Sequence, residues 1–248
     1  MKNAIAYSCF ALINVISLSV HAEKTTPFEM KDDNIIINES SIIRPTTTQA
    51  RIVGSSAVSI DDHAYLLSSS KWPHTSIYVC WENPSVTSSF ERNLVKSAIH
   101  NTWGRHSKLG FKGWKKCREN TRGIRILISD EGPHVKALGN ALDGMKNGMV
   151  LNFEYNNWSP TCKTMKISCN TSIAVHEFGH ALGFAHEQNR PDTPGECLEP
   201  PQGSDGDVML TSWDIDSVMN YCNPTYNNNG ELSTLDVKAL HMVYGQGD

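Results

Sequence analysis

His176-Glu177-Phe178-Gly179-His180-Ala181-Leu182-Gly183-Phe184-Ala185-His186 is the stretch that decides the interpretation of this sequence. Residues four apart lie on the same face of a helix, so His176 and His180 would present two imidazoles to one point. Gly183 follows three residues after His180. Glycine adopts the left-handed conformation that ends a helix, and the resulting turn would bring His186 toward the same point from another direction.

Three imidazoles converging on one point indicate a zinc site. Zinc is bound tetrahedrally, and three protein ligands leave a fourth position for water, as in catalytic rather than structural sites. Glu177 follows the first ligand, close enough to touch that water but angled away from the metal, so it is the candidate general base. The alternative is a helix with three core or surface histidines. The five specified positions would match by chance in only about 1 in 10⁵ chains of this length.

The composition is that of an ordinary globular protein. The chain has 248 residues, 39% hydrophobic and 19% charged, enough for one or two domains with a core. The net charge of −4 provides no basic field that would favour nucleic acid or an anionic membrane. We therefore expect no nucleic-acid partner.

The first 22 residues have the features of a signal peptide. Lys2 gives a short basic region, the residues at 4–20 are mostly apolar, and Val20-His21-Ala22 provides the small residues of a cleavage site. A weak membrane helix is the alternative, but Asn14 and several serines dilute the apolar run. The segment predicts a secreted or periplasmic protein without a stable membrane anchor.

Residues 23–70 are polar and read as an N-terminal extension or propeptide, followed by a catalytic domain at 71–248. Propeptides of secreted peptidases often block the active site. No cysteine is present here to bind the zinc, so Asp61 or Asp62 are the candidates for a blocking ligand. The alternative is that both are solvated loop carboxylates.

Six cysteines follow residue 22, and an even number behind a signal peptide indicates disulfides in an oxidising compartment. Six cysteines allow 15 pairings, among which the sequence cannot choose. By proximity along the chain we guess Cys80–Cys117, Cys162–Cys169 and Cys197–Cys222. A second metal site made of thiolates is the alternative, but it lacks a Cys-x-x-Cys pair.

Hydrophobic periodicity predicts strands and helices around the histidine motif. A capping box at 88–91 starts a helix that ends near Gly104, and Thr171-Ser172 would cap the zinc helix, which runs to about Leu182. Residues 187–231 are loop-rich, and a last helix starts at 233 and stops at Gly245. The predicted strands are 77–81, 124–129 and 148–153, with a short strand at the sheet edge in 138–142.

A second motif, Ser217-Val218-Met219-Asn220-Tyr221, lies 31 residues beyond His186 (217 − 186). Together with the histidine motif it resembles the metzincin zinc metallopeptidases, in which a methionine turn forms an apolar floor beneath the metal. The resemblance implies an α+β fold of the zincin-like type. It would have a twisted mixed sheet and an active-site helix above a loop-rich C-terminal lobe that ends in a helix.

Within the metzincins, His186-Glu187-Gln188-x-Arg190 and the turn sequence look most like the astacin group. Asn220 departs from that pattern, because astacins usually carry histidine there. The segment 232–245 also resembles matrix metallopeptidases. In astacins the turn tyrosine, here Tyr221, is an extra zinc ligand at rest and stabilises the oxyanion during reaction. The alternative for Tyr221 is a packed aromatic. The glutamate after the third histidine, here Glu187, is linked in astacins to the mature N-terminus; the alternative is a solvated carboxylate.

The resemblance implies a secreted zinc-dependent endopeptidase acting on protein or peptide substrates. Zinc-bound water would attack the peptide carbonyl, with Glu177 as general base and then acid, and Tyr221 assisting the metal at the oxyanion. The substrate would lie extended along the edge strand near 138–142, and we expect a monomer. Two alternatives stay open: a zinc-bearing binding protein or toxin component with little turnover, and a narrow-specificity peptidase for one surface or cell-wall target.

Overall fold

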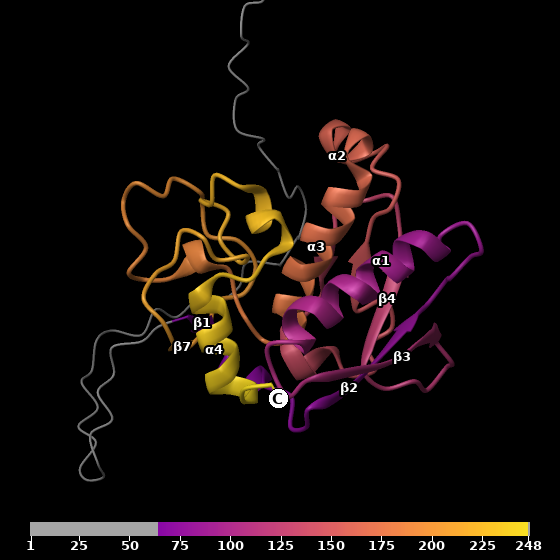
Figure 1. Cartoon of the computed structure of the whole chain (residues 1–248), viewed down its shortest axis with the longest axis horizontal. Helices are drawn as coiled ribbons and strands as arrows, with labels where there is room; N and C mark the ends of the chain where they lie inside the picture. The colour runs from indigo at the N-terminus through magenta and orange to yellow at the C-terminus, as the bar shows by residue number, and fades with distance from the viewer. Residues whose placement is uncertain (1–63, 248) are drawn as a thin grey trace, which may run out of the picture. The chain divides into compact units, whose positions relative to one another are not determined.

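The computed structural model describes residues 64–247 (Figure 1). The predicted signal peptide, most of the 23–70 extension, and Asp61 and Asp62 lie outside these residues. Within 64–247, no helix is both long enough and apolar enough to span a bilayer.

A five-stranded mixed sheet forms one layer of the domain, in the order β3-β2-β4-β6-β5. The first four of these strands are mutually parallel, and β5 runs antiparallel to β6 at one edge. This confirms the predicted mixed sheet. The strands are β2 (Ser76–Trp81), β3 (Gly110–Lys116), β4 (Ile124–Ile128), β5 (His134–Val135) and β6 (Met149–Leu151).

Helices cover the sheet, and the two longest elements of this layer, α1 and α3, lie against each other (Figure 1). Phe178 of α3 packs edge-on against Phe111 and stacks on Trp114, both of β3. Trp103, which follows α1, donates from Nε1 to the Val175 carbonyl at 2.8 Å. The helices are α1 (Ser89–Ile99), continued by one π-helical turn (His100–Gly104), α2 (Pro160–Thr164), α3 (Lys166–Ala181) and α4 (Thr234–Tyr244).

The C-terminal part is loop-rich, as predicted, with α4 as its only α-helix within the described chain. Ser233 and Asp236 form a reciprocal capping box at the start of α4, and Gly245 follows its last residue, Tyr244. The remaining short elements are β1 (Tyr65–Leu66), β7 (Val208–Met209) and 3₁₀ turns at Ser68–Ser70, Gly139–Leu142, Glu187–Asn189 and Tyr226–Gly230.

The predicted edge strand at 138–142 is wrong. This segment forms a 3₁₀ turn, and the two edges of the sheet are β3 and β5. Gly139 has φ = +54°, a left-handed and not an extended conformation. A Cβ there would lie 1.9 Å from the carbonyl oxygen of Ser70, so only glycine fits this close approach of the two backbone segments.

One predicted helix start is wrong, and one predicted capping hydrogen bond is not formed. The zinc helix begins at Lys166 rather than after Thr171-Ser172, and the Thr171 hydroxyl donates to the Ile167 carbonyl inside the helix at 2.9 Å. Helix α1 begins at Ser89 with Ser88 as its N-cap residue, as predicted, but the Ser88 side chain makes no capping hydrogen bond and instead accepts from the backbone amide of Ser85. At Ser88 a local side-chain bond thus replaces the expected cap.

The three proximity pairings are confirmed: Cys80–Cys117, Cys162–Cys169 and Cys197–Cys222. The second disulfide joins α2 to the first turn of α3. The third closes the loop-rich segment after the zinc helix.

Residues 64–70 are part of the folded domain. β1 pairs antiparallel with β7, and the Leu67 amide donates to the Gly183 carbonyl at 3.0 Å. The Ala185 amide donates to the Tyr65 carbonyl at 2.9 Å. The segment therefore lies between the turn that follows α3 and the loop that contains β7. The boundary at residue 71 stays a prediction about processing.

Candidate active site

The three histidines of the motif meet at one point. Gly183, with φ = +101°, makes the turn after α3, and a Cβ there would lie 2.7 Å from the Ser70 hydroxyl. His186 Nε2 then lies 3.2 Å from His176 Nε2 and 3.1 Å from His180 Nε2. Four tetrahedral zinc bonds of about 2.0–2.1 Å would separate ligand nitrogens by about 3.3–3.4 Å, so the spacing fits one ion.

Each histidine is oriented by a backbone carbonyl. Nδ1 of His176 lies 2.8 Å from Val218 O, that of His180 lies 2.8 Å from Phe184 O, and that of His186 lies 3.0 Å from Gln202 O. A carbonyl only accepts, so each Nδ1 carries the hydrogen and donates. The Nε2 lone pairs are thereby left to face the centre, as they do in metal-binding histidines whose other ring nitrogen donates to the protein.

Burial keeps the three rings in the form that binds metal. It lowers the pKa of His176 to about 3 and that of His186 to about 4, and it lowers the pKa of His180 well below the usual value, helped by the neighbouring imidazoles. All three are therefore neutral at pH 7. The three-histidine cluster fits a catalytic zinc ion.

Met219 lies directly against the zinc helix. A Cβ on Gly179, which sits between the two helical ligands, would come within 2.3 Å of the Met219 sulfur. The turn is therefore packed beneath the site, as expected from the methionine-turn motif. Met219 is 3% exposed, so its side chain is enclosed on the remaining sides as well.

Tyr221 reaches the histidine cluster. Its hydroxyl lies 3.3 Å from His176 Nε2, and its ring stacks on the His176 imidazole with centroids 5.1 Å apart. The Tyr221 amide donates to Gln188 Oε1 at 3.1 Å, which fixes the backbone beneath the ring. The phenol thus lies within reach of a metal held by the three histidines, while its catalytic role stays a prediction. Glu177 is buried, 5% exposed, in α3 next to His176.

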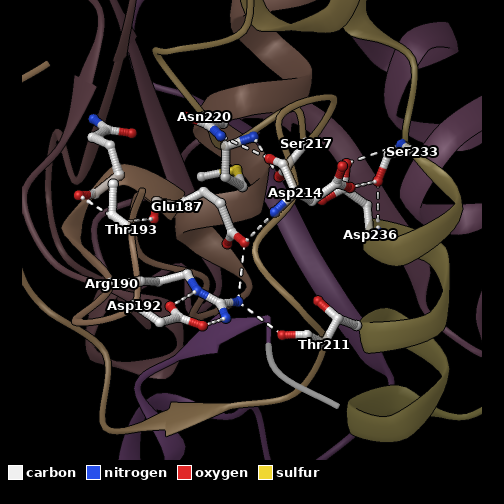
Figure 2. Close-up of polar contacts among 12 residues, drawn as sticks. Glu187, Arg190, Asp192, Thr193, Thr211, Asp214, Ser217, Asn220, Ser233 and Asp236 are labelled. Atoms are coloured by element: carbon white, nitrogen blue, oxygen red, sulfur yellow. Dashed lines mark hydrogen bonds and ion pairs between the residues drawn. The ribbon is translucent and has the colours of Figure 1, made fainter. Parts of the chain in front are cut away.

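A buried polar network follows the third ligand (Figure 2). Glu187 accepts from Arg190 Nη1 at 3.0 Å and from the Asp214 amide at 3.1 Å. Arg190 also makes a bidentate pair with Asp192, at 2.8 and 2.7 Å, and donates to the Thr211 carbonyl. Burial raises the pKa of Glu187 to about 8, partly offset by Arg190. Its predicted link to a mature N-terminus stays a prediction.

Asp236 connects α4 to the methionine turn, a role that was not predicted from the sequence. It accepts from the Ser217 hydroxyl at 2.7 Å (Figure 2) and from the Val218 amide at 2.9 Å. The Val218 carbonyl in turn orients His176. Burial raises the pKa of Asp236 to about 6. The Ser233–Asp236 capping box at the start of α4 could have indicated this role, because it fixes the direction of the Asp236 carboxylate.

Comparison with known proteins agrees with this geometry. Residues 66–195 match the profile of the peptidase family described as Astacin. Bone morphogenetic protein 1 of Xenopus laevis is 30% identical over 92 residues, 30% of this chain and 13% of that protein. Interstitial collagenase of Bos taurus is 26% identical over 164 residues, 60% of this chain and 34% of that protein. The chain thus spans about a third or less of these relatives' lengths.

A solved structure of myroilysin has a similar fold. The match covers 74% of this chain and 100% of that one, with a TM-score of 0.53 and 20% sequence identity.

Proposed function

The chain belongs to the astacin family of peptidases, and we propose from this that it is a zinc-dependent endopeptidase acting on protein or peptide substrates. The observation that carries the proposal is the convergence of three neutral imidazole Nε2 atoms beside a buried glutamate on the same helix. No serine or cysteine nucleophile is needed in such a site.

The side chains divide the chemistry between them. His176, His180 and His186 would hold a zinc ion, which would supply the Lewis acidity for activating water and polarising the substrate carbonyl. Glu177 accepts the proton of the attacking water and passes it to the leaving amine. The Tyr221 hydroxyl donates a hydrogen bond to the oxyanion as it develops.

The substrate would bind in extended form along β5. This strand is the antiparallel edge of the sheet and lies beside α3, so its outer backbone groups can pair with a peptide strand. This position replaces the 138–142 segment, which is not a strand.

We infer that the protein works outside the cytoplasm, in the periplasm or beyond the cell, as a monomer. The three disulfides support an oxidising compartment, and residues 1–22 would direct export. Cleavage between residue 22 and the folded domain would then activate the enzyme, if the segment is a propeptide, or leave its activity unchanged, if it is a plain extension.

The test is Glu177→Gln, compared with the wild type on an unfolded protein substrate, with metal content measured in parallel. We expect one zinc per chain in both proteins. Turnover by the variant should be lower by about 10²–10⁴-fold, because the carboxylate serves as general base. A chelator should abolish wild-type cleavage, and zinc should restore it.

Normal turnover by zinc-loaded Glu177→Gln would refute the mechanism. Zinc binding without cleavage of any of a proteome-wide set of peptides would favour the zinc-bearing binding protein. Cleavage of one target alone would favour the narrow-specificity peptidase.

A further inference from the structure

A cationic hollow lies beside β3, at the edge of the sheet opposite β5. It has a volume of about 800 Å³ and is lined by Tyr78, the end of β3 and the loop that follows as far as Arg122. Residues 110–125 contain six lysines and arginines but only one acidic residue, Glu119. This concentration of positive charge contrasts with the net charge of −4 for the whole chain.

Of the four cations that line the hollow, three are exposed and have no counter-ion within the described residues. Among the described residues, no ion pair involves Lys115, Lys116 or Arg118. Arg122 differs, because it pairs with Asp143 at 2.5 Å. Lys115, Lys116 and Arg118, here called the basic triad, therefore retain their full charge for an external anion.

A disulfide and the hydrogen bonds of one buried arginine hold the backbone of the basic triad in place. Cys117, between Lys116 and Arg118, is joined to β2 by its disulfide with Cys80. The buried Arg125 forms a bidentate pair with Glu82, at 2.9 and 3.1 Å. Its Nη1 also donates to the Glu119 carbonyl at 2.8 Å and the Thr121 carbonyl at 3.2 Å, which holds the loop. A ligand would thus meet a pre-ordered surface and lose little free energy in ordering it.

The shape of this surface favours an extended polypeptide. β3 pairs with β2 on one side only, and within the described chain no strand pairs with its outer side. An edge strand can accept a peptide strand through backbone hydrogen bonds. Arg118 can bind a carboxylate bidentately, and Tyr78, 46% exposed, offers an aromatic face within the hollow.

We propose that the basic triad and the outer edge of β3 form an exosite that binds an acidic polypeptide segment of the substrate. This rests on the proposed peptidase function. The two edges of one sheet would then divide recognition: β5 would hold the residues around the scissile bond, and β3 a remote acidic segment. Binding at the second edge would raise the affinity for substrates that carry such a segment, without changing the chemistry at the zinc.

A direct binding experiment tests the exosite without any turnover. The probe is a fluorescently labelled peptide of ten glutamates, added to wild-type protein, to Lys115→Ser/Lys116→Ser/Arg118→Ser, and to Lys96→Ser/Lys108→Ser/Lys163→Ser. The last variant is the matched control, because it removes three exposed lysines from other surfaces. We expect the triad variant to bind about ten-fold or more weakly than wild type and control, and binding to weaken with salt.

The second arm measures cleavage of one peptide with and without an acidic tail. The tail should lower KM about ten-fold for wild type and control but not for the triad variant, with kcat unchanged in all three. Failure of the wild type to cleave either peptide would refute the proposed function, while the binding arm would still report on the exosite.

If the triad variant bound the peptide as tightly as the wild type, the proposal would be overturned. The lysines would then serve only to keep the exposed edge strand from pairing with other chains and aggregating. Tighter binding of a sulfated oligosaccharide with ten charges would also overturn the proposal, in favour of a polysaccharide surface.

Discussion

Replacing Gly179 by alanine should destabilise the domain, although alanine normally strengthens a helix. Glycine in a helix interior is about 1 kcal/mol less favourable than alanine, so an open site would gain that amount. At this position the new methyl group would lie 2.3 Å from the Met219 sulfur and 3.1 Å from Trp103. The sulfur would have to move by about 1.1 Å (3.4 − 2.3) to regain an ordinary contact.

The neighbours leave little room for that movement. Met219 is 3% exposed, and Trp103 is held by its bond to Val175 O and by stacking on Phe184 with centroids 5.7 Å apart. Overpacking of a core costs about 1–3 kcal/mol, and rigid neighbours favour the upper half of that range. After the gain of about 1 kcal/mol in helix propensity is subtracted, we expect the free energy of unfolding to fall by about 1–2 kcal/mol. For a domain of this size that is a fall in Tm of about 2–8 °C.

The assay is thermal unfolding, in a chelator and with zinc. Gly195→Ala is the matched control, because nothing lies within 4 Å of a Cβ there. Zinc affinity should also fall in Gly179→Ala, since the displaced turn includes the Val218 carbonyl that orients His176. In a double-mutant cycle, Met219→Ala should cost less in the Gly179→Ala background than in wild type. A Gly179→Ala protein as stable as wild type under both conditions would refute this account of the methionine turn.

Three further predictions concern other parts of the domain. Tyr221→Phe should fold and bind zinc normally but lower kcat more than it raises KM, by less than the 10²–10³-fold typical of a lost oxyanion donor; an unchanged kcat would leave the tyrosine as packing. Alkylation without reduction should label none of the six cysteines after residue 22, and two labelled thiols would contradict the disulfides. A chain starting at residue 64 should bind zinc more tightly and be more stable than one starting at 71, by about 3 kcal/mol or more, because the shorter chain loses the buried Tyr65 and Leu66. Equal zinc affinity and stability would show that β1 is dispensable.

The metal ligands could be predicted because their spacing follows from helix geometry. His176 and His180 lie one turn apart on one helix, and the left-handed Gly183 makes the turn that brings His186 to them. The disulfides could be guessed because each joins cysteines that are neighbours along the chain. These features depend on local geometry, which residue order fixes directly.

Other features depend on contacts that residue order does not reveal. Strand β3 was not predicted, because its register shifts beside Trp114, which has φ = +56° and breaks the alternation of the strand. The edge strand β5 has only two residues, too few for a periodic signal. The network of Glu187, Arg190 and Asp192 depends on how the loop-rich segment folds back, which composition does not determine.

The orientation of all three histidines by main-chain oxygens has a consequence for how the protein tolerates variation. A carbonyl oxygen persists whatever side chain its residue carries, so no single substitution at Val218, Phe184 or Gln202 deletes the acceptor. In a library of single substitutions, these three positions should accept replacements to the extent that local packing allows. The histidines themselves should accept none. The orientation of the metal ligands thus depends on the backbone conformation and not on the side chains at these three positions. Side chains there can therefore change during evolution while the metal centre stays the same.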